Sequence, residues 1–334
     1  MRILLVSNMY PARLRPEFGL FVAGIASELR RRGHDVELAV VRDHRTGPLR
    51  TPVKYAFLAV RALSLARERP DVVYAHYLVP TGLVGVVAAA AARAPLVVTA
   101  HGTDVANTRR SPLLAWLTRW VMRRSAAVVV VSDYLARRLP DGARRVEVID
   151  CGVDTGFFRP GPRPQPGPPR YLFVGALIER KNPRRLLEAF ARLEEGTLTV
   201  VGGGPLEHEL RASAPAGVSF TGRVTPEGVR EQLLAADVLV APSEEEPQGQ
   251  QVLEALACGR PVVATRVGGP AEVVDPLCGV LVDPLDVGAI ADGMRAAAEL
   301  PVPCQAAVEA AAAHDRAAQA ARIEALLAEV SGAH

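Results

Sequence analysis

Aromatic residues, lysine and net charge are all scarce in this 334-residue chain. Aromatic side chains make up 5% of it and hydrophobic residues 49%, so we expect aliphatic cores, with enough apolar material for two domains. The formal net charge is only +3, which argues against a nucleic-acid partner. Lysine occurs only at Lys54 and Lys181 in an otherwise arginine-rich chain, so a lysine in a predicted phosphate loop is notable.

The cysteines and the apolar runs exclude further classes of protein. The four cysteines lack the spacing of a metal site or a CxxC pair. Cys151 and Cys258 lie beside apolar segments and are expected to be buried. This cysteine usage indicates a reducing cytosol. No apolar run reaches the about 18 residues of a membrane span. The run after Met1 ends by Ser7, too short for a signal peptide, so the expected location is the cytoplasm.

Apolar runs alternate with helical patterns along both halves of the chain, which is typical of parallel sheets covered by helices on both faces. The helix expected at Phe21–Arg32 ends at Gly33, and each half is predicted to be a doubly wound α/β domain. The predicted strands are Ile3–Ser7, Val36–Val41, Val72–Ala75, Leu96–Ala100, Ala127–Val131, Val146–Ile149, Tyr171–Val174, Leu198–Val201, Val218–Phe220, Val238–Ala241, Pro261–Ala264 and Gly279–Val282.

A proline-rich segment, residues 159–170, separates the two halves and is predicted to be a semi-rigid linker. The first domain is then residues 1–158 and the second 171–304. Two such domains imply a cleft between them, with ligands at the carboxyl ends of strands. Residues 305–334 are predicted to be an alanine-rich helix, and whether it crosses back to the first domain stays open.

The stretch from Pro242 to Thr265 is the most informative. It runs strand, carboxylate-rich loop, Gly249, helix, glycine-proline, strand. A helix entered through glycine exposes free N–H groups at the positive end of its dipole, which suits a phosphate. Glu246 precedes this helix and Glu254 lies on it, so the pattern fits a sugar nucleotide held between two carboxylates. Taken alone, both glutamates would more often be structural, and it is the surrounding order of elements that favours a site.

Two other loops follow predicted strands. His101, at the end of one strand, can bond a sugar hydroxyl or assist a leaving group, and Asp104 with two small residues indicates an open loop there. Arg180 and Lys181 precede a helix and could meet a diphosphate. The alternatives are a histidine bonded to backbone and a solvated basic pair. No nicotinamide fingerprint, P-loop or serine triad is present.

The helix expected over residues 111–125 carries Leu113, Trp116, Leu117 and Trp120 on one face. Such a face could rest on an anionic membrane. The favoured alternative is an ordinary helix that covers the sheet. A peripheral contact with the inner face of the membrane therefore stays open.

With these segments in place, the chain resembles glycosyltransferase family 4, the retaining nucleotide-sugar enzymes of GT-B architecture, over nearly its whole length. The most specific segment is Glu246-x7-Glu254 with the sequence that surrounds it. The supporting segments are Arg32-Gly33-His34-Asp35-Val36, His101-Gly102-Thr103-Asp104, Val131-Ser132, Gly152-Val153-Asp154, the Lys181 loop and Phe220-Thr221-Gly222-Arg223-Val224.

The resemblance implies a role for each matching residue. Glu246 and the N–H groups of Gln248, Gly249 and Gln250 would hold the donor sugar and the diphosphate. Glu254 would bind the ribose. Lys181, with Arg180, would neutralise the diphosphate, and Gly19 would lie close to the phosphates. Arg223 and Val224 would lie against the base. His101 would contact the sugar near the reacting carbon.

The sequence departs from the family pattern at several of these positions. Ala176 stands where the family often has arginine, so the diphosphate would depend more on Lys181. Gln248 replaces a usual aromatic residue and Gln250 a usual aliphatic one, which leaves the donor sugar open. Cys151 stands where asparagine is usual.

The resemblance implies a hexosyltransferase that retains the anomeric configuration and needs no metal or other cofactor. The donor would be a UDP-, GDP- or ADP-sugar. The acceptor hydroxyl, on an envelope polysaccharide, a glycolipid, a natural product or a lipid-linked molecule, would meet the loops at residues 8–18 and 103–110. Two rival functions share the architecture: a nucleotide-sugar epimerase, and a catalytically silent protein that binds nucleotide sugars. Dependence of turnover on an acceptor separates the three.

Overall fold

The computed structural model describes residues 1–12, 18–42, 47, 50–162 and 167–332. They form two compact units, each with its own sheet. The first unit comprises Met1–Cys151 together with Arg316–His334, and the second comprises Gly152–Asp315. No helix within the described ranges combines the length and the apolar character needed to cross a bilayer.

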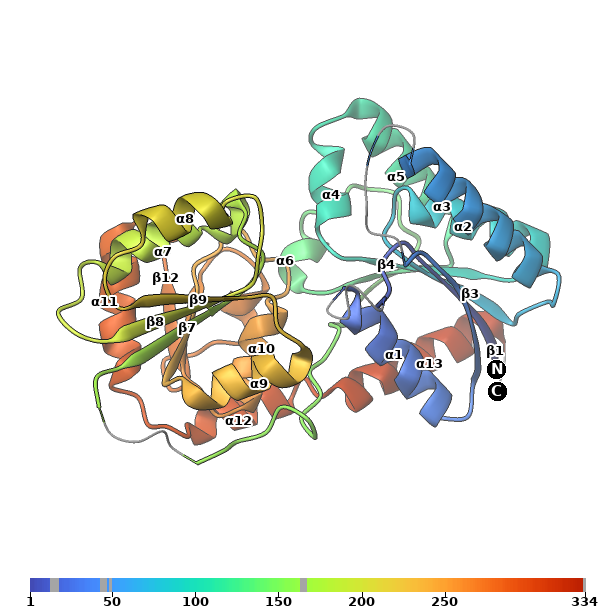
Figure 1. The fold of residues 1–334 in the computed structure, drawn as a ribbon. Helices are drawn as coiled ribbons and strands as arrows, with labels where there is room; N and C mark the ends of the chain where they lie inside the picture. Colours follow the sequence, from blue (N-terminus) through green and yellow to red (C-terminus); the bar gives the residue numbers. More distant parts are fainter. Residues whose placement is uncertain (13–17, 43–46, 48–49, 163–166, 333–334) are drawn as a thin grey trace. The chain divides into compact units, whose positions relative to one another are not determined.

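The first unit is built on a parallel sheet with the strand order β2-β1-β3-β4-β5-β6. Helices α2, α3 and α5 cover one face of this sheet, and α1 and α13 cover the other (Figure 1). The strands are β1 (Arg2–Ser7), β2 (Asp35–Val40), β3 (Val72–His76), β4 (Leu96–Ala100), β5 (Ala127–Val130) and β6 (Val146–Val148). The helices are α1 (Leu20–Arg31), α2 (Arg50–Ala66), α3 (Thr81–Ala92), α4 (Thr103–Thr108), α5 (Pro112–Arg124), α6 (Asp133–Ala136) and α13 (Arg316–Ser331).

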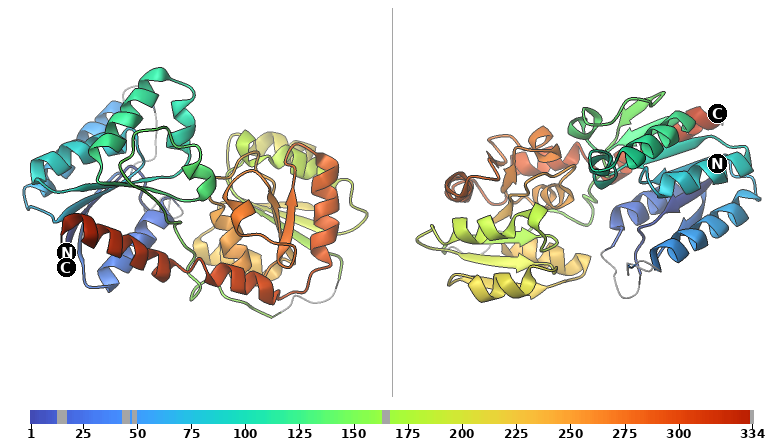
Figure 2. Two further views of the ribbon diagram at one scale, coloured as in Figure 1. Left: turned by 180° about the vertical axis from the view of Figure 1, so that it is seen from behind. Right: turned by 90° about the horizontal axis from the view of Figure 1, so that it is seen from above.

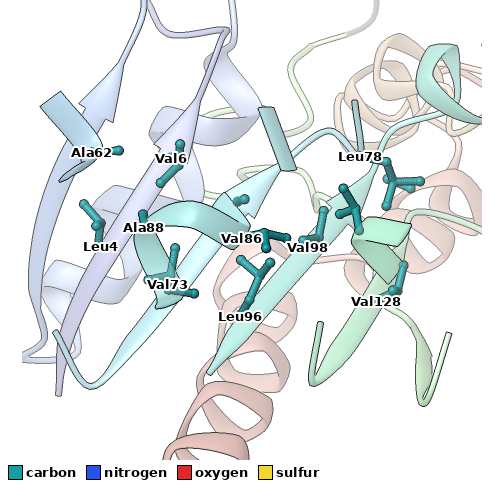
Figure 3. Close-up of a cluster of buried hydrophobic side chains, with 14 of the residues drawn as sticks. Leu4, Val6, Ala62, Val73, Leu78, Val86, Ala88, Leu96, Val98 and Val128 are labelled. Carbon is teal, nitrogen blue, oxygen red and sulfur yellow. The ribbon is translucent and has the colours of Figure 1, made fainter. Parts of the chain in front are cut away.

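Both faces of this sheet are buried, which explains the continuous apolar runs. Leu4 and Val6 of β1 point into the cluster beneath α2, α3 and α5 (Figure 3), whereas Ile3 and Leu5 pack under α1 and α13. Successive side chains of a strand point to opposite faces, so a strand covered on both sides must be apolar at every position.

The second unit repeats this plan with the strand order β12-β11-β10-β7-β8-β9. One core cluster lies under α9, α10 and α12, and another under α7, α8 and α11. The strands are β7 (Arg170–Val174), β8 (Thr197–Val201), β9 (Val218–Gly222), β10 (Val238–Ala241), β11 (Val262–Thr265) and β12 (Gly279–Val282). The helices are η1 (Glu179–Lys181), α7 (Pro183–Phe190), α8 (Glu207–Ser213), α9 (Pro226–Ala235), α10 (Gln250–Ala257), η2 (Gly269–Glu272), α11 (Val287–Ala298) and α12 (Gln305–Ala312).

The predicted fold class is confirmed: two parallel sheets with helices on both faces form two Rossmann-like domains. Every predicted strand is present, with ends shifted by at most two residues. The expected burial of Cys151 and Cys258 is also confirmed.

The linker prediction is wrong. The chain passes between the units at Cys151–Gly152 and again at Asp315–Arg316, so the proline-rich segment lies inside the second unit. In its described part, the carbonyl of Pro162 accepts a hydrogen bond from Arg260; residues 163–166 lie outside the described residues. Proline content predicts an absence of helix and strand, but it does not predict where contacts between domains are few.

The C-terminal segment is two helices rather than one. Helix α12 packs against α10 in the second unit, and α13 packs along α1 in the first (Figure 2). At the break between them, Val153 N–H donates to the carbonyl of His314 at 2.9 Å. The two crossings of the chain therefore run side by side where the second unit begins.

Each sheet has a point where the order of winding reverses. In the first unit this point lies between β1 and β3, and in the second between β7 and β10. Doubly wound sheets bind ligands outside the carboxyl ends of the strands at such a reversal. The loops after β7 and β10 are therefore the first place to look for a site.

Candidate active site

Two loops meet at the reversal point of the second unit. The loop after β7 carries Arg180 and Lys181, and the loop after β10 carries residues 244–246. The guanidinium Nη1 of Arg180 donates to the carbonyl of Glu245 at 2.9 Å, and the N–H of Glu244 donates to the carbonyl of Arg180 at 2.9 Å. Main-chain and side-chain bonds thus join the predicted phosphate loop to the predicted sugar loop.

Glu246 and Lys181 form a buried ion pair at the centre of this junction. Glu246 is 7% exposed, and its Oε2 accepts a hydrogen bond from the Lys181 ammonium. Ser243 Oγ and Gln251 Nε2 each lie 3.2 Å from the same oxygen. Burial alone would raise the pKa of Glu246, but the charge and hydrogen bond of Lys181, with Arg180 and Gln251, lower the pKa below its ordinary value. Glu246 is therefore a carboxylate at neutral pH.

Gly268 holds the Glu246 backbone in place. The N–H of Glu246 donates to Val267 O at 3.1 Å, and Gly269 N–H donates to Glu246 O at 2.9 Å. A Cβ added at Gly268, where φ is 133°, would lie 1.9 Å from Glu246 O. Only glycine allows this close approach, so a position in the β11–η2 connection fixes the carboxylate after β10.

Gly249, which has a φ of 85°, is the N-cap of helix α10. The first N–H groups of a helix have no partner inside it and lie at the positive end of the helix dipole. Glu254 is half-buried on the same helix, one turn beyond Gln250. The N–H groups predicted to bind a phosphate and the two carboxylates of the motif therefore belong to one continuous segment.

The glutamines that replace the usual apolar residues are bonded to one another. Gln248 Nε2 donates to Gln250 Oε1 at 3.2 Å, and Gln250 Nε2 donates to the carbonyl of Gly152 at 3.0 Å. The Gln250 side chain is thus committed to the backbone at the start of the second unit.

Arg223 and Val224 follow β9 at the same edge of this sheet. Arg223 Nη2 lies 3.5 Å from the carbonyl of Gly203, in the glycine turn after β8. Val224 is partly buried against the core cluster that includes α10. The structure therefore places these residues along the edge that carries Lys181 and Glu246, two strands from β7.

In the first unit, Gly19 lies against the loop after β1. Its φ is 72°, and an added Cβ would lie 2.7 Å from the carbonyl carbon of Met9. Gly19 thereby lets α1 begin close to the carboxyl end of β1, at the reversal point of the sheet. Residues 13–17 of the predicted acceptor loop lie outside the described residues.

His101 is enclosed by aromatic rings and by a second histidine. Its Nε2 lies 3.0 Å from Nδ1 of His76, and its Nδ1 lies 3.9 Å from the Cys151 thiol. The centroids of the Phe21 and Tyr77 rings lie 4.6 Å and 4.7 Å from the centroid of the His101 ring. Burial, with a smaller effect of His76, holds the pKa of His101 well below its ordinary value, so the ring is neutral at physiological pH.

The histidine pair favours one arrangement of protons. His76 is 2% exposed, and its Nε2 has no hydrogen-bond partner among the described residues. If His101 donated to His76, that nitrogen would be a buried N–H without an acceptor, which is rarer than an unpaired acceptor. His76 Nδ1–H therefore donates to His101 Nε2, and His101 carries its proton on Nδ1.

The prediction of an open loop at residues 101–104 is wrong. Asp104 is 3% exposed and accepts hydrogen bonds from four backbone N–H groups, those of Leu78, His101, Gly102 and Val105. Residues 103–108, expected to be a loop, form α4. Burial raises the pKa of Asp104, and the N–H bonds offset part of that rise. A carboxylate between small residues can close a turn on itself, which the composition of the segment does not reveal.

Each unit also contains residues that the sequence reasoning missed. Ser243 and Gln251 bond Glu246, and His76 bonds His101. His76 is the last residue of a parallel strand, the same signal that drew attention to the segment after β4. Ser243 and Gln251 flank the recognised motif but carry no spacing rule of their own.

The fold and the site together define a glycosyltransferase of the two-domain GT-B class. Residues 19–157 match the model described as Glycosyltransferase Family 4, and residues 168–299 match the model described as Glycosyl transferases group 1. The chain belongs to this family.

The relatives agree with this assignment. The D-inositol 3-phosphate glycosyltransferase of Mycobacterium avium is 32% identical, over 88% of this chain and 84% of its own length. Among solved structures, sucrose-phosphate synthase from Thermosynechococcus elongatus superposes with a TM-score of 0.82 at 19% identity, covering all of both chains. HepE of Anabaena, in complex with UDP-glucose, gives 0.79 at 20% identity, covering 98% of this chain and 100% of HepE. At these identities the structures show the fold alone.

Proposed function

We propose that this glycosyltransferase moves a sugar from a nucleoside-diphosphate sugar to an acceptor hydroxyl, with retention at the anomeric carbon and without a metal ion. One observation carries the proposal: the Lys181–Glu246 ion pair lies beside the glycine-started helix α10 at the reversal point of the second sheet. This arrangement offers cations and N–H groups for a diphosphate beside a carboxylate for sugar hydroxyls. The complex of HepE with UDP-glucose supports the same class of donor.

In this proposal each donor contact has a distinct task. Glu246 accepts from hydroxyls of the donor sugar, and Glu254 accepts from hydroxyls of the ribose. The N–H groups of residues 248–250 bind the diphosphate, Gly19 approaches the phosphates, and Arg223 with Val224 lies against the base. The close packing at Gly268 would keep Glu246 fixed while the donor enters, so little reorganisation is needed on binding.

The leaving diphosphate develops charge as the glycosidic bond breaks. Arg180, Lys181 and the start of α10 stabilise that charge, which is the electrophilic help that a metal ion would otherwise supply. Ser243 and Gln251 also donate hydrogen bonds to Glu246. Glu246 therefore does not depend on Lys181 alone, and the Lys181 ammonium can also attract the phosphate. The attack proceeds on the front face, and a diphosphate oxygen takes the proton of the acceptor hydroxyl.

His101 contacts the sugar near the reacting carbon in this account. The neutral ring carries its proton on Nδ1. To donate that proton to a sugar oxygen, His101 must give up the contact between Nδ1 and the Cys151 thiol. A thiol is a weak hydrogen-bond partner, so this exchange costs little. His101 therefore acts as a hydrogen-bond donor and not as a general base.

We place the enzyme in the cytoplasm, with an acceptor bound by the first unit. The arginines at residues 109–110 favour an anionic or lipid-linked acceptor. On α5, Leu113 and Trp116 are exposed, whereas Leu117 and Trp120 are partly buried, so that helix mainly covers the sheet.

Product analysis tests the proposal. The full chain is incubated with UDP-, GDP- and ADP-sugars, with and without a panel of hydroxyl acceptors, in the presence of a chelator. The expected product forms only with an acceptor and keeps the anomeric configuration of the donor, as read by NMR. Lys181→Gln should lower kcat, and Lys54→Gln is the matched control. An inverted product, an isomerised donor without acceptor, or a trapped glycosyl-enzyme adduct would each contradict it.

A further inference from the structure

Helix α2 presents apolar side chains to solvent. Val53, Phe57 and Val60 are 69%, 61% and 67% exposed. They are spaced i, i+4, i+7, so they form one stripe along the helix. The opposite side of α2 packs Leu58, Ala62 and Ala66 into the core. The exposed stripe is therefore a second apolar face that the fold of this unit does not need.

Basic residues outnumber acidic ones around this stripe. The sequence from His44 to Arg67 contains no Asp or Glu, and α2 itself carries Arg50, Lys54 and Arg61. Helices α3 and α5, on the same face of the sheet (Figure 1), carry no acidic residue either. The only acidic residue between Asp71 and Asp133 is Asp104, which is buried. This face of the first unit is thus cationic as well as apolar.

A groove of about 1190 Å³ runs beside the stripe, between α2 and the edge strand β2. Arg30, Arg42, Arg50, Lys54 and Arg61 line it together with apolar residues of both elements. Among the described residues that line it, the one carboxylate is Glu37, whose pKa is raised first by burial and then by its hydrogen bond to Glu68. Arg61 Nε donates to the carbonyl of Leu38 at 2.9 Å, which fixes one cation at the edge of the groove.

We propose that α2 docks this protein on an anionic membrane surface, with Val53, Phe57 and Val60 entering the acyl boundary and the cations of α2 binding lipid phosphates. Charge complementarity selects this occupant. A second copy of the same face would bring like charges together. An anionic leaflet instead offers acyl chains to the apolar stripe and negative headgroups to the cations. The proposal does not depend on the sugar donor, so it can fail while the proposed function stands.

The test is flotation of the full chain with vesicles of phosphatidylcholine alone and of phosphatidylcholine mixed with phosphatidylglycerol. Binding is expected only to the anionic vesicles, with an affinity that falls as salt is raised. The triple variant Val53→Gln, Phe57→Gln, Val60→Gln should lose binding by more than about tenfold. Arg50→Gln with Lys54→Gln should lose about fivefold for each cation removed.

Two controls make the outcome decisive. Leu277→Gln with Leu285→Gln removes equally exposed apolar side chains from the second unit and should leave binding unchanged. Leu113→Gln with Trp116→Gln removes exposed apolar side chains from α5 of the first unit and should also leave binding unchanged. An α2 variant that stays folded by circular dichroism yet still floats with the vesicles would overturn the proposal. So would loss of binding in the α5 variant alone, absence of binding by the wild type, or α2-dependent self-association without vesicle binding.

Discussion

Replacing Lys181 by methionine should leave a buried carboxylate without its counter-ion. The Glu246 side chain is 9% exposed and that of Lys181 is 13% exposed, so water can replace little of the lost attraction. Removing one partner of such a buried pair costs about 3 kcal/mol. For a unit of this size that cost corresponds to a fall of about 6–12 °C in the unfolding midpoint.

The pH dependence of this loss follows from the direction of the pKa shifts. In the wild type the pKa of Glu246 is lowered, so its contribution to stability is present at neutral pH and is lost as the pH falls through that lowered pKa. In Lys181→Met, burial should raise the pKa instead. The cost of the bare carboxylate is then greatest at neutral pH and shrinks as Glu246 takes up a proton. The difference in unfolding free energy between the wild type and Lys181→Met should therefore shrink as the pH falls toward about 4.

Thermal unfolding followed by circular dichroism between neutral and acid pH is the assay. Lys54→Met is the matched control, since Lys54 is the only other lysine and belongs to α2. The double variant Lys181→Met, Glu246→Gln should recover most of the lost stability. A loss equal to that of Lys54→Met, or one that is the same at every pH, would refute the reasoning.

Three further variants test other parts of the structure. Gly268→Ala should destabilise by about 3 kcal/mol or more because its Cβ collides with Glu246 O, whereas Gly33→Ala, with a φ of 88° and no atom within 4 Å, should cost only about 1–2 kcal/mol; denaturant unfolding compares the two. His76→Phe should move the ¹⁵N resonances of His101 from the Nδ1–H form toward a mixture of tautomers, and unchanged resonances would contradict the inferred proton arrangement. Arg260 is fully buried and donates to the carbonyls of Leu233 and Leu234 at the end of α9. Arg260→Met should therefore cost about 3 kcal/mol, and a melting temperature equal to that of the wild type would show that these bonds contribute nothing.

Much of the fold could be predicted from the sequence because its signals are local. A strand buried on both faces must be a continuous apolar run, so Val238–Ala241 and Leu96–Ala100 were located to the residue. The motif from Glu246 to Glu254 was recognisable because the loop, the glycine and the helix are contiguous in the chain. Its chemistry depends on neighbours in sequence.

The features that escaped prediction depend on neighbours in space. The pairing of Lys181 with Glu246 requires β7 to lie beside β10, and strand order is not written in periodicity. The bond from His76 to His101 joins adjacent strands for the same reason. Asp104 was misjudged because four backbone N–H groups, invisible in the sequence, enclose its carboxylate. The apolar stripe of α2 has the same helical spacing as a core-facing stripe, so only exposure distinguishes them.

Binding of nucleotides to the wild type and to Glu254→Ala tests the central claim most directly. UDP, GDP and ADP are added in a thermal-shift titration, with Glu231→Ala, an exposed change on α9, as the matched control. A ligand at 100 times its dissociation constant should add about 2.7 kcal/mol of stability. The account predicts a shift with one base that persists in Glu231→Ala and is lost in Glu254→Ala. No shift with any nucleotide, or an equal shift in all three proteins, would contradict the donor site described above.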